Sequence, residues 1–139
     1  MRRKRKKQIN RTGFTLVELL VVIVILAMLS GIVAPKLVGQ IAKAKFQACR
    51  PKMASVESAI DTFVLNTGVY PDTLDDLIFC PSGYEELWEG PYLKEKQLLD
   101  TWDRPFYYDP YQGNPYLLIS YGADGQEGGT GYDTDIYND

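Results

Sequence analysis

Residues 14–33 form an uninterrupted apolar run of 20 residues in which Glu18 is the only ionisable side chain. A helix of that length spans roughly 30 Å, which matches the hydrocarbon core of a bilayer. The run therefore predicts a membrane-spanning helix. A carboxylate within such a helix costs about 2.5 kcal/mol or more in lipid, so something must compensate Glu18.

After Pro35 the apolar pattern changes from continuous to periodic. Apolar side chains recur at intervals of three and four residues as far as Val64, and lysine, glutamine and arginine occupy positions between them. This spacing indicates an amphipathic helix whose apolar stripe faces a core. We expect one helix over residues 14–66, ended by Gly68. Whether Pro35 and Pro51 kink the helix, or Pro51 breaks it, stays open.

The second half of the chain has short elements separated by turn residues. Residues 72–78 indicate a short helix with Asp72 or Thr73 as its N-cap. Residues 106–108 and 116–121 have strand composition and predict an antiparallel hairpin, extended by a third short strand. A long N-terminal helix followed by a small antiparallel sheet is an α+β fold.

Charge is distributed unevenly along the chain. Residues 1–13 carry seven basic side chains and no acid, whereas the remainder carries 8 basic and 18 acidic residues. A basic segment directly before an apolar run is typical of the cytoplasmic flank of a membrane helix, and is favoured here over a nucleic-acid-binding arm. The acidic remainder argues against nucleic acid as a partner and leaves carboxylates for a hard cation.

The chain contains two cysteines, Cys49 and Cys80, and no histidine. A His-based catalytic triad and a structural zinc site are therefore excluded. No phosphate-binding glycine loop follows a strand, so we do not expect an enzyme. A disulfide between Cys49 and Cys80 and two unpaired thiols are both open, because sequence spacing does not give the distance between them.

Gly13 lies between the basic segment and the apolar run, an order that a conventional secretory signal does not have. The sequence Gly-Phe-Thr-Leu-Val-Glu of residues 13–18 resembles the class III signal of the type IV pilin and pseudopilin superfamily. The resemblance implies that a prepilin peptidase/methyltransferase cleaves after Gly13 and methylates the new amine of Phe14. The resemblance further implies that this amine, in a neighbouring subunit, compensates the charge of Glu18 and that the pair guides subunit register in a filament.

Two further segments resemble the major pseudopilins of type II secretion within that superfamily. Residues 90–93, Gly-Pro-Tyr-Leu, look like their G-P-Y-L segment, and residues 100–106 look like D-P-W-G-N-P-Y. Thr101, Asp103 and Arg104 depart from the second pattern, in which proline, glycine and asparagine occupy these positions.

Residues 120–136 are rich in glycine and acidic side chains. From composition alone, a solvated acidic turn is favoured over an ion site. The pattern S-x-G-A-D-G-x-E-G-G followed by D-x-D-I, however, resembles the calcium loop of major pseudopilins. The resemblance implies a structural Ca²⁺ with oxygen ligands from the side chains of Asp124, Asp133 and Asp135, the carbonyl of Tyr121 and the hydroxyl of Ser120.

The resemblance also implies a domain organisation and a function. Residues 1–13 would be a leader peptide, residues 14–34 a transmembrane and assembly helix, and residues 35–139 a periplasmic domain. The protein would be a single-pass protein of the bacterial inner membrane, in contact with lipid. It would polymerise with copies of itself, minor pseudopilins and an inner-membrane assembly platform into a secretion pseudopilus. The alternative is a type IV pilin or minor pilin in adhesion, motility or DNA uptake.

Overall fold

The computed structural model describes residues 13–138, without the side chains of residues 32–35. The contacts divide the chain into two compact units, Met1–Val38 and Gly39–Asp139. Residues 1–12, which belong to the predicted leader, lie outside the described residues. The predicted role of that segment stays a prediction.

Helix α1, Leu16–Thr67, contributes to both units and confirms the predicted long helix apart from its end residues. Pro51 does not break it. The proline lacks the N–H that would bond the carbonyl of Gln47, and both residues are exposed rather than part of the core. Past the helix end, Gly68 has a φ of +80° and donates its N–H to the carbonyl of Val64 at 2.8 Å.

One side of α1 forms the core of the second unit. The buried positions follow the predicted spacing of three and four residues, and each of these five side chains is at most 2% exposed: Cys49, Met53, Val56, Ile60 and Phe63. Burial of such a stripe is the main source of stability for a helix of this kind.

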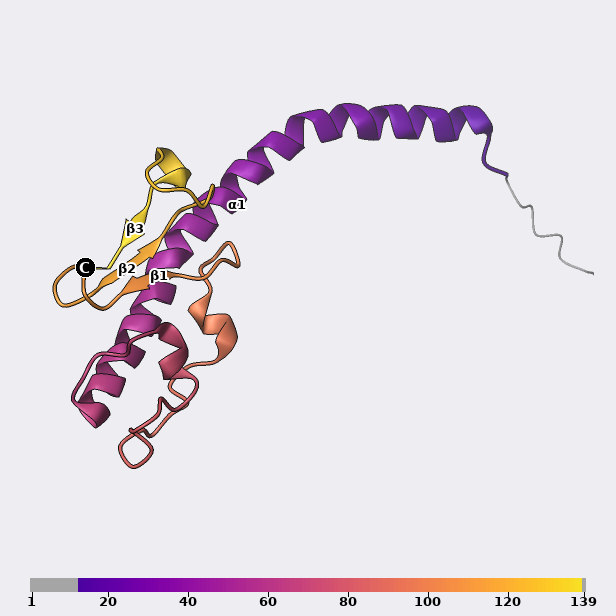
Figure 1. The fold of residues 1–139 in the computed structure, drawn as a ribbon. Coiled ribbons are helices and arrows are strands. Elements are labelled where there is room, and N and C mark those ends of the chain that lie inside the picture. Colours follow the sequence, from indigo (N-terminus) through magenta and orange to yellow (C-terminus); the bar gives the residue numbers. More distant parts are fainter. Residues whose placement is uncertain (1–12, 139) are drawn as a thin grey trace, which may run out of the picture. The chain divides into compact units, whose positions relative to one another are not determined.

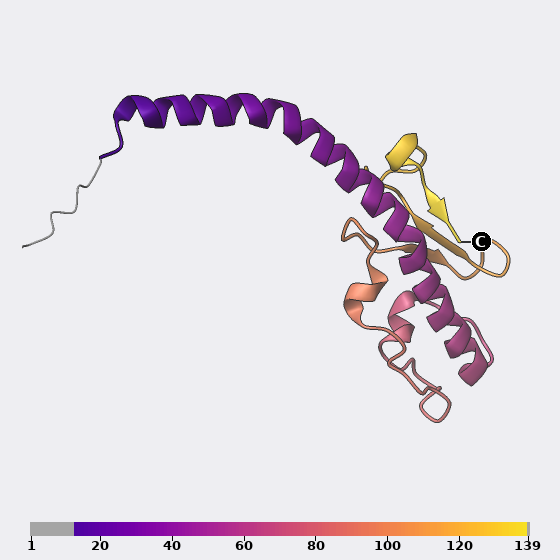
Figure 2. The same ribbon diagram turned by 180° about the vertical axis from the view of Figure 1, so that it is seen from behind.

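Three short strands pack beside the C-terminal part of α1 (Figures 1 and 2). They are β1, Tyr107–Asp109, β2, Leu117–Ser120, and β3, Ile136–Tyr137, and they form an antiparallel sheet in the order β1-β2-β3. Leu118 of β2 is fully buried and belongs to the same core as α1. The predicted α+β fold with a third strand is therefore confirmed.

Three single-turn 3₁₀ helices complete the second unit: η1, Leu74–Leu77, η2, Glu95–Leu98, and η3, Gly131–Asp133. The short helix predicted at residues 72–78 is thus present only over Leu74–Leu77. It is a 3₁₀ helix, which is more tightly wound than an α-helix. Thr73 caps it, and the Thr73 N–H donates to the Asp76 carboxylate at 2.9 Å. Leu77 and Leu98 anchor η1 and η2 in the core.

The cysteines do not form a disulfide. Cys49 lies fully buried in the core stripe of α1, whereas Cys80 is exposed in the loop after η1, and both are free thiols. Of the two alternatives that the sequence left open, the structure has the unpaired thiols.

Candidate functional site

Two regions hold the residues that the sequence singles out, and the first is the start of α1. Gly13 and Phe14 precede the helix, and Phe14 is 81% exposed. Glu18 accepts hydrogen bonds from the N–H of Thr15 at 2.9 Å and from its hydroxyl at 3.0 Å, while the Glu18 N–H donates to the Thr15 hydroxyl at 3.2 Å. This arrangement is a capping box, which the sequence pattern Thr-x-x-Glu could have revealed.

The helix that follows presents apolar side chains on all its sides. Within the first unit, the large apolar side chains from Leu16 to Leu29 are 43–84% exposed. Among the described residues, no single helix is both long enough and apolar enough to span a membrane. The two stretches Leu16–Gly31 and Lys36–Thr67, taken together, are long and apolar enough to do so. Such a surface needs lipid or other apolar helices around it.

The second region is the C-terminal loop between β2 and β3. Gly122 has a φ of +60°, and a Cβ there would lie 2.5 Å from the carbonyl oxygen of Asp133, so the two arms of the loop touch at this glycine. The carboxylate of Asp135 accepts the N–H of Gly128 at 2.9 Å and the hydroxyl of Tyr137 at 3.3 Å. Asp133 and Asp135 therefore both contact the glycine-rich arm.

The other predicted ligands are engaged differently. Asp124 accepts the N–H of Gln126 at 3.0 Å in a local turn, and the carbonyl of Tyr121 accepts the N–H of Gly125 at 3.0 Å. Among residues 13–138, no group of three or more acidic or cysteine side chains lies close enough to hold a metal ion. The three predicted aspartates thus lie in one loop, but their carboxylates do not converge on one position where an ion could bind.

Ser120, the remaining predicted ligand, is buried and donates its hydroxyl to Oδ2 of Asp100 at 2.8 Å. Asp100 is itself 2% exposed, and its Oδ1 accepts the N–H groups of Trp102 at 2.8 Å and Arg104 at 3.0 Å. Lys52 of α1 donates to the Asp100 carbonyl at 3.0 Å. Asp100 therefore ties the helix, the turn at residues 100–105 and β2 together.

Two features of the loop suit a cation. Oδ1 of Asp135 is buried and has no hydrogen-bond partner among the described residues, which leaves a carboxylate oxygen unsatisfied. Burial, followed by the charges of Tyr107, Glu127 and Asp135, raises the pKa of Tyr121. Burial, then Asp135 and Glu127, likewise raises the pKa of Tyr137. In both cases burial is the larger cause, and the nearby carboxylates of Asp135 and Glu127 add to it.

One cation already lies at this loop. The guanidinium of Arg104 donates from Nη2 to the carbonyl of Ala123, and a Cβ at Gly125 would overlap it. Its backbone is held by Asp100, so Arg104 links the buried Asp100 to the C-terminal loop. In the sequence, this turn departs from the major-pseudopilin pattern. Nothing in the sequence indicated that the side chains of Asp100 and Arg104 organise the C-terminal loop.

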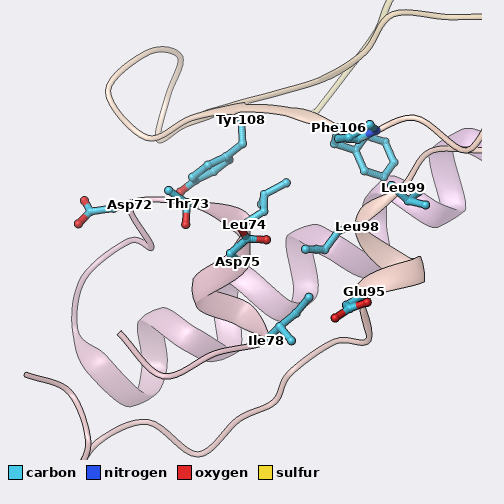
Figure 3. Close-up of a pocket in the computed structure, with 11 residues that line it drawn as sticks. Asp72, Thr73, Leu74, Asp75, Ile78, Glu95, Leu98, Leu99, Phe106 and Tyr108 are labelled. Carbon is cyan, nitrogen blue, oxygen red and sulfur yellow. The ribbon is translucent and has the colours of Figure 1, made fainter. Parts of the chain in front are cut away.

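A separate hollow lies on the second unit between η1, η2 and β1 (Figure 3). Its volume is about 350 Å³, and Leu74, Ile78, Leu98 and Phe106 provide apolar lining. The sequence gave no indication of it, because its walls come from three segments that only tertiary packing brings together.

Two family models match the chain. The model of type II secretion system protein G matches residues 36–139, and the model of the prokaryotic N-terminal methylation motif matches residues 9–34. The second match includes the junction at Gly13 and Phe14 together with Glu18. Of the two interpretations that the sequence left open, secretion pseudopilin and type IV pilin, the matched family is the secretion one.

Individual relatives agree with these matches. The type II secretion system core protein G of Vibrio cholerae is 38% identical over 139 residues, which cover 96% of this chain and 94% of that protein. The protein of the same name from Xanthomonas campestris pv. campestris is 35% identical over 128 residues, covering 91% and 89%. The crystal structure of the major pseudopilin from the type 2 secretion system of enterohaemorrhagic Escherichia coli superposes with a TM-score of 0.55 at 26% identity, covering 75% of this chain and 94% of that one. The chain belongs to the type II secretion system protein G family.

Proposed function

We propose that this chain is a structural, non-enzymatic subunit of a type II secretion pseudopilus, anchored in the membrane and polymerising through its N-terminal helix. The observation that carries the proposal is the combination of two modules in one chain. A methylation motif over residues 9–34 opens a helix with exposed apolar sides, and the protein G domain follows directly. Assembly would cover the apolar helix, which explains why it remains exposed in a single copy.

Processing at the start of the helix is the first part of this proposal. Cleavage after Gly13 would leave Phe14 as the N-terminus, and methylation would keep a cation there. The intact mass of the chain extracted from membranes tests this directly. We expect the mass of residues 14–139 plus one methyl group; a chain that is inserted in the membrane and still carries residues 1–13 would refute the processing step.

Glu18 has two candidate roles that variants can separate. As a charge, it would pair with the methylated amine of another copy and set subunit register; as a capping residue, it would stabilise the helix start through Thr15. Glu18→Gln keeps a capping side chain and removes the charge, whereas Thr15→Val keeps the charge and removes the cap. Register control by charge predicts that Glu18→Gln loses sedimentable filaments while Thr15→Val retains them. The opposite result would assign Glu18 to capping alone.

The C-terminal loop is proposed to bind a structural Ca²⁺. Support comes from the unsatisfied Oδ1 of Asp135 and from the oxygen-rich composition of the loop, with Asp124, Asp133 and the Tyr121 carbonyl as further donors. The hydroxyl of Ser120 is a weaker candidate, because it already donates to Asp100. Bound calcium would stabilise the folded state by linkage, by about 2.7 kcal/mol at a free concentration 100 times the dissociation constant.

Melting of the mature chain in detergent, with calcium and with a chelator, tests this site. We expect calcium to raise the melting temperature of the wild-type chain and of Glu89→Gln, an exposed acid outside the loop. Asp135→Asn should lose the calcium-dependent increase. Equal melting of all three chains with and without calcium would refute the metal site and leave the assembly proposal intact.

The proposed location is the bacterial inner membrane, with residues 35–139 in the periplasm. The partners would be further copies of this chain, minor pseudopilins and an inner-membrane assembly platform. Cysteine accessibility from the periplasm tests the orientation, because Cys80 is exposed. A membrane-impermeant maleimide added to spheroplasts should label Cys80; labelling only after lysis would place the domain on the cytoplasmic side.

A further inference from the structure

The hollow between η1, η2 and β1 has an apolar lining and an acidic rim. All of its charged lining residues are acids: Asp72, Asp75 and Glu95, and all three are exposed. In Figure 3, Asp72 and Glu95 lie at opposite edges, with the side chains of Leu74 and Leu98 between them. Lys94 and Lys96 flank Glu95 in the sequence but do not line the hollow.

The rim carboxylates are available for an external partner. Neither Asp75 nor Glu95 has a side-chain hydrogen bond or ion pair to another of the described residues, and Asp72 has one long hydrogen bond, 3.3 Å from the hydroxyl of Tyr111. A hollow with this chemistry suits an apolar side chain followed closely by a positive charge.

The same chain presents such a group on α1. Leu37, Val38 and Ile41 are 50%, 67% and 58% exposed, although they are large apolar side chains. Lys45 lies one helical turn beyond Ile41, so the two side chains share one face of the helix. None of these residues lines the hollow of its own chain.

The distribution of charge favours this pairing between copies. Residues 19–56 contain five basic side chains and no acid, whereas residues 57–139 contain 17 acidic and three basic side chains. Domains that are so acidic repel one another when they stack in a homopolymer. A contact between the basic helical segment of one copy and the acidic hollow of the next replaces that repulsion with attraction.

We propose that the acidic hollow receives the segment of residues 37–45 of a second copy, with Ile41 entering the apolar floor and Lys45 pairing with the rim carboxylates. This inference rests on the proposed assembly of the chain and adds the surfaces through which neighbouring domains meet. We identify the partner as another copy because the complementary groups occur together on this chain and outside its own hollow: Leu37, Val38 and Ile41 are exposed, and Lys45 beside them is partly exposed.

Cross-linking within assembled filaments tests the contact. In a Cys80→Ser background, Ile41→Cys is combined in turn with Asp72→Cys, Asp75→Cys and Glu95→Cys, and filaments are treated with a short bis-maleimide. We expect a ladder of covalent multimers for at least one rim position. Ile41→Cys with Glu89→Cys is the matched control, because Glu89 is an exposed acid that does not line the hollow, and it should stay monomeric.

Charge reversal gives an independent measurement. Lys45→Glu and Glu95→Lys should each reduce the sedimentable fraction by up to about fivefold, the range for an exposed ion pair, and the double variant should recover most of the loss. Lys43→Glu combined with Glu95→Lys is the control and should not recover it, because Lys43 projects from another side of the helix than Ile41.

The outcomes separate this inference from the proposed function. Wild-type filaments with no ladder at any rim position, or with no recovery in the Lys45→Glu, Glu95→Lys double variant, overturn the hollow as the interface and leave assembly standing. A mature wild-type chain that forms no filaments at all overturns both. Equal ladders at the rim and at the Glu89 control overturn the specificity of the contact, and with it the inference.

Discussion

Asp100 provides a test of how the second unit is held together. Its buried carboxylate accepts three hydrogen bonds, from the Trp102 and Arg104 backbones and from the Ser120 hydroxyl. Replacement by alanine removes the acceptor for all three donors at once. Because the site is buried, water cannot replace the lost acceptor without rearrangement.

The expected cost follows from these contacts. A hydrogen bond to a charged group contributes about 1.5–3 kcal/mol, but bonds that share one carboxylate are not additive. We therefore expect Asp100→Ala to lower the free energy of unfolding by about 3–5 kcal/mol, which is more than one such bond contributes and less than three independent bonds would. Ser120→Ala removes one of these bonds and should cost about 1.5–3 kcal/mol. Glu89→Ala, at an exposed acid, should change stability by about 0.5 kcal/mol or less.

Urea unfolding of the mature chain in detergent, followed by tryptophan fluorescence, measures these differences. The Asp100→Ala, Ser120→Ala double variant should be about as stable as Asp100→Ala alone, because the Ser120 bond is already lost. A loss below about 1 kcal/mol for Asp100→Ala would refute its role as the organising residue. If Ser120 were instead a calcium ligand, Ser120→Ala would reduce the calcium-dependent part of the stability and leave the calcium-free value unchanged.

Three further predictions concern single side chains. Asp103 has a φ of +61°, so Asp103→Gly should raise the free energy of unfolding by up to about 1 kcal/mol and Asp103→Val should lower it; a stabilising valine would contradict the strain. Burial, then the charges of Glu57, Asp61 and Tyr70, raises the pKa of Tyr116, so the folded state holds this proton more tightly. Stability should fall as pH rises above about 10, the pKa of an unfolded tyrosine, and Tyr116→Phe should make the fall shallower in urea unfolding at a series of pH values. An aromatic disulfide reagent should modify Cys80 in the folded chain, slowly at neutral pH because desolvation and Glu85 raise its thiol pKa, and Cys49 only after unfolding; prompt modification of two thiols would contradict the burial of Cys49.

Much of the fold follows from local pattern. The spacing of apolar residues along residues 37–64 predicts the buried stripe of α1, because helical periodicity alone decides which side chains share a face. Gly68 predicts the end of the helix for a similarly local reason, since its left-handed conformation suits the residue past the last turn. The hairpin at residues 106–121 is likewise predicted by strand composition on both sides of a turn.

Long-range contacts explain what the sequence did not show. The α1 helix passes Pro51 because its core stripe continues to bury apolar side chains on both sides of the proline. Ser120 donates to Asp100, 20 residues away in the chain, so its hydroxyl has a structural role that no local pattern indicates. Arg104 reaches the carbonyl of Ala123 in the same way.

By itself, the sequence determined the N-terminal methylation motif, the apolar helix, the amphipathic helix and the family resemblance, because each depends on neighbouring residues or on a fixed spacing. Only the tertiary structure decided that Cys49 and Cys80 stay apart, that Asp100 and Arg104 hold the C-terminal loop, and that an acidic hollow forms between η1, η2 and β1. These features join segments that are distant in the chain. Their geometry depends on how the helix, the sheet and the loops pack around one core. No single stretch of residues specifies that packing, because it requires contacts between distant segments.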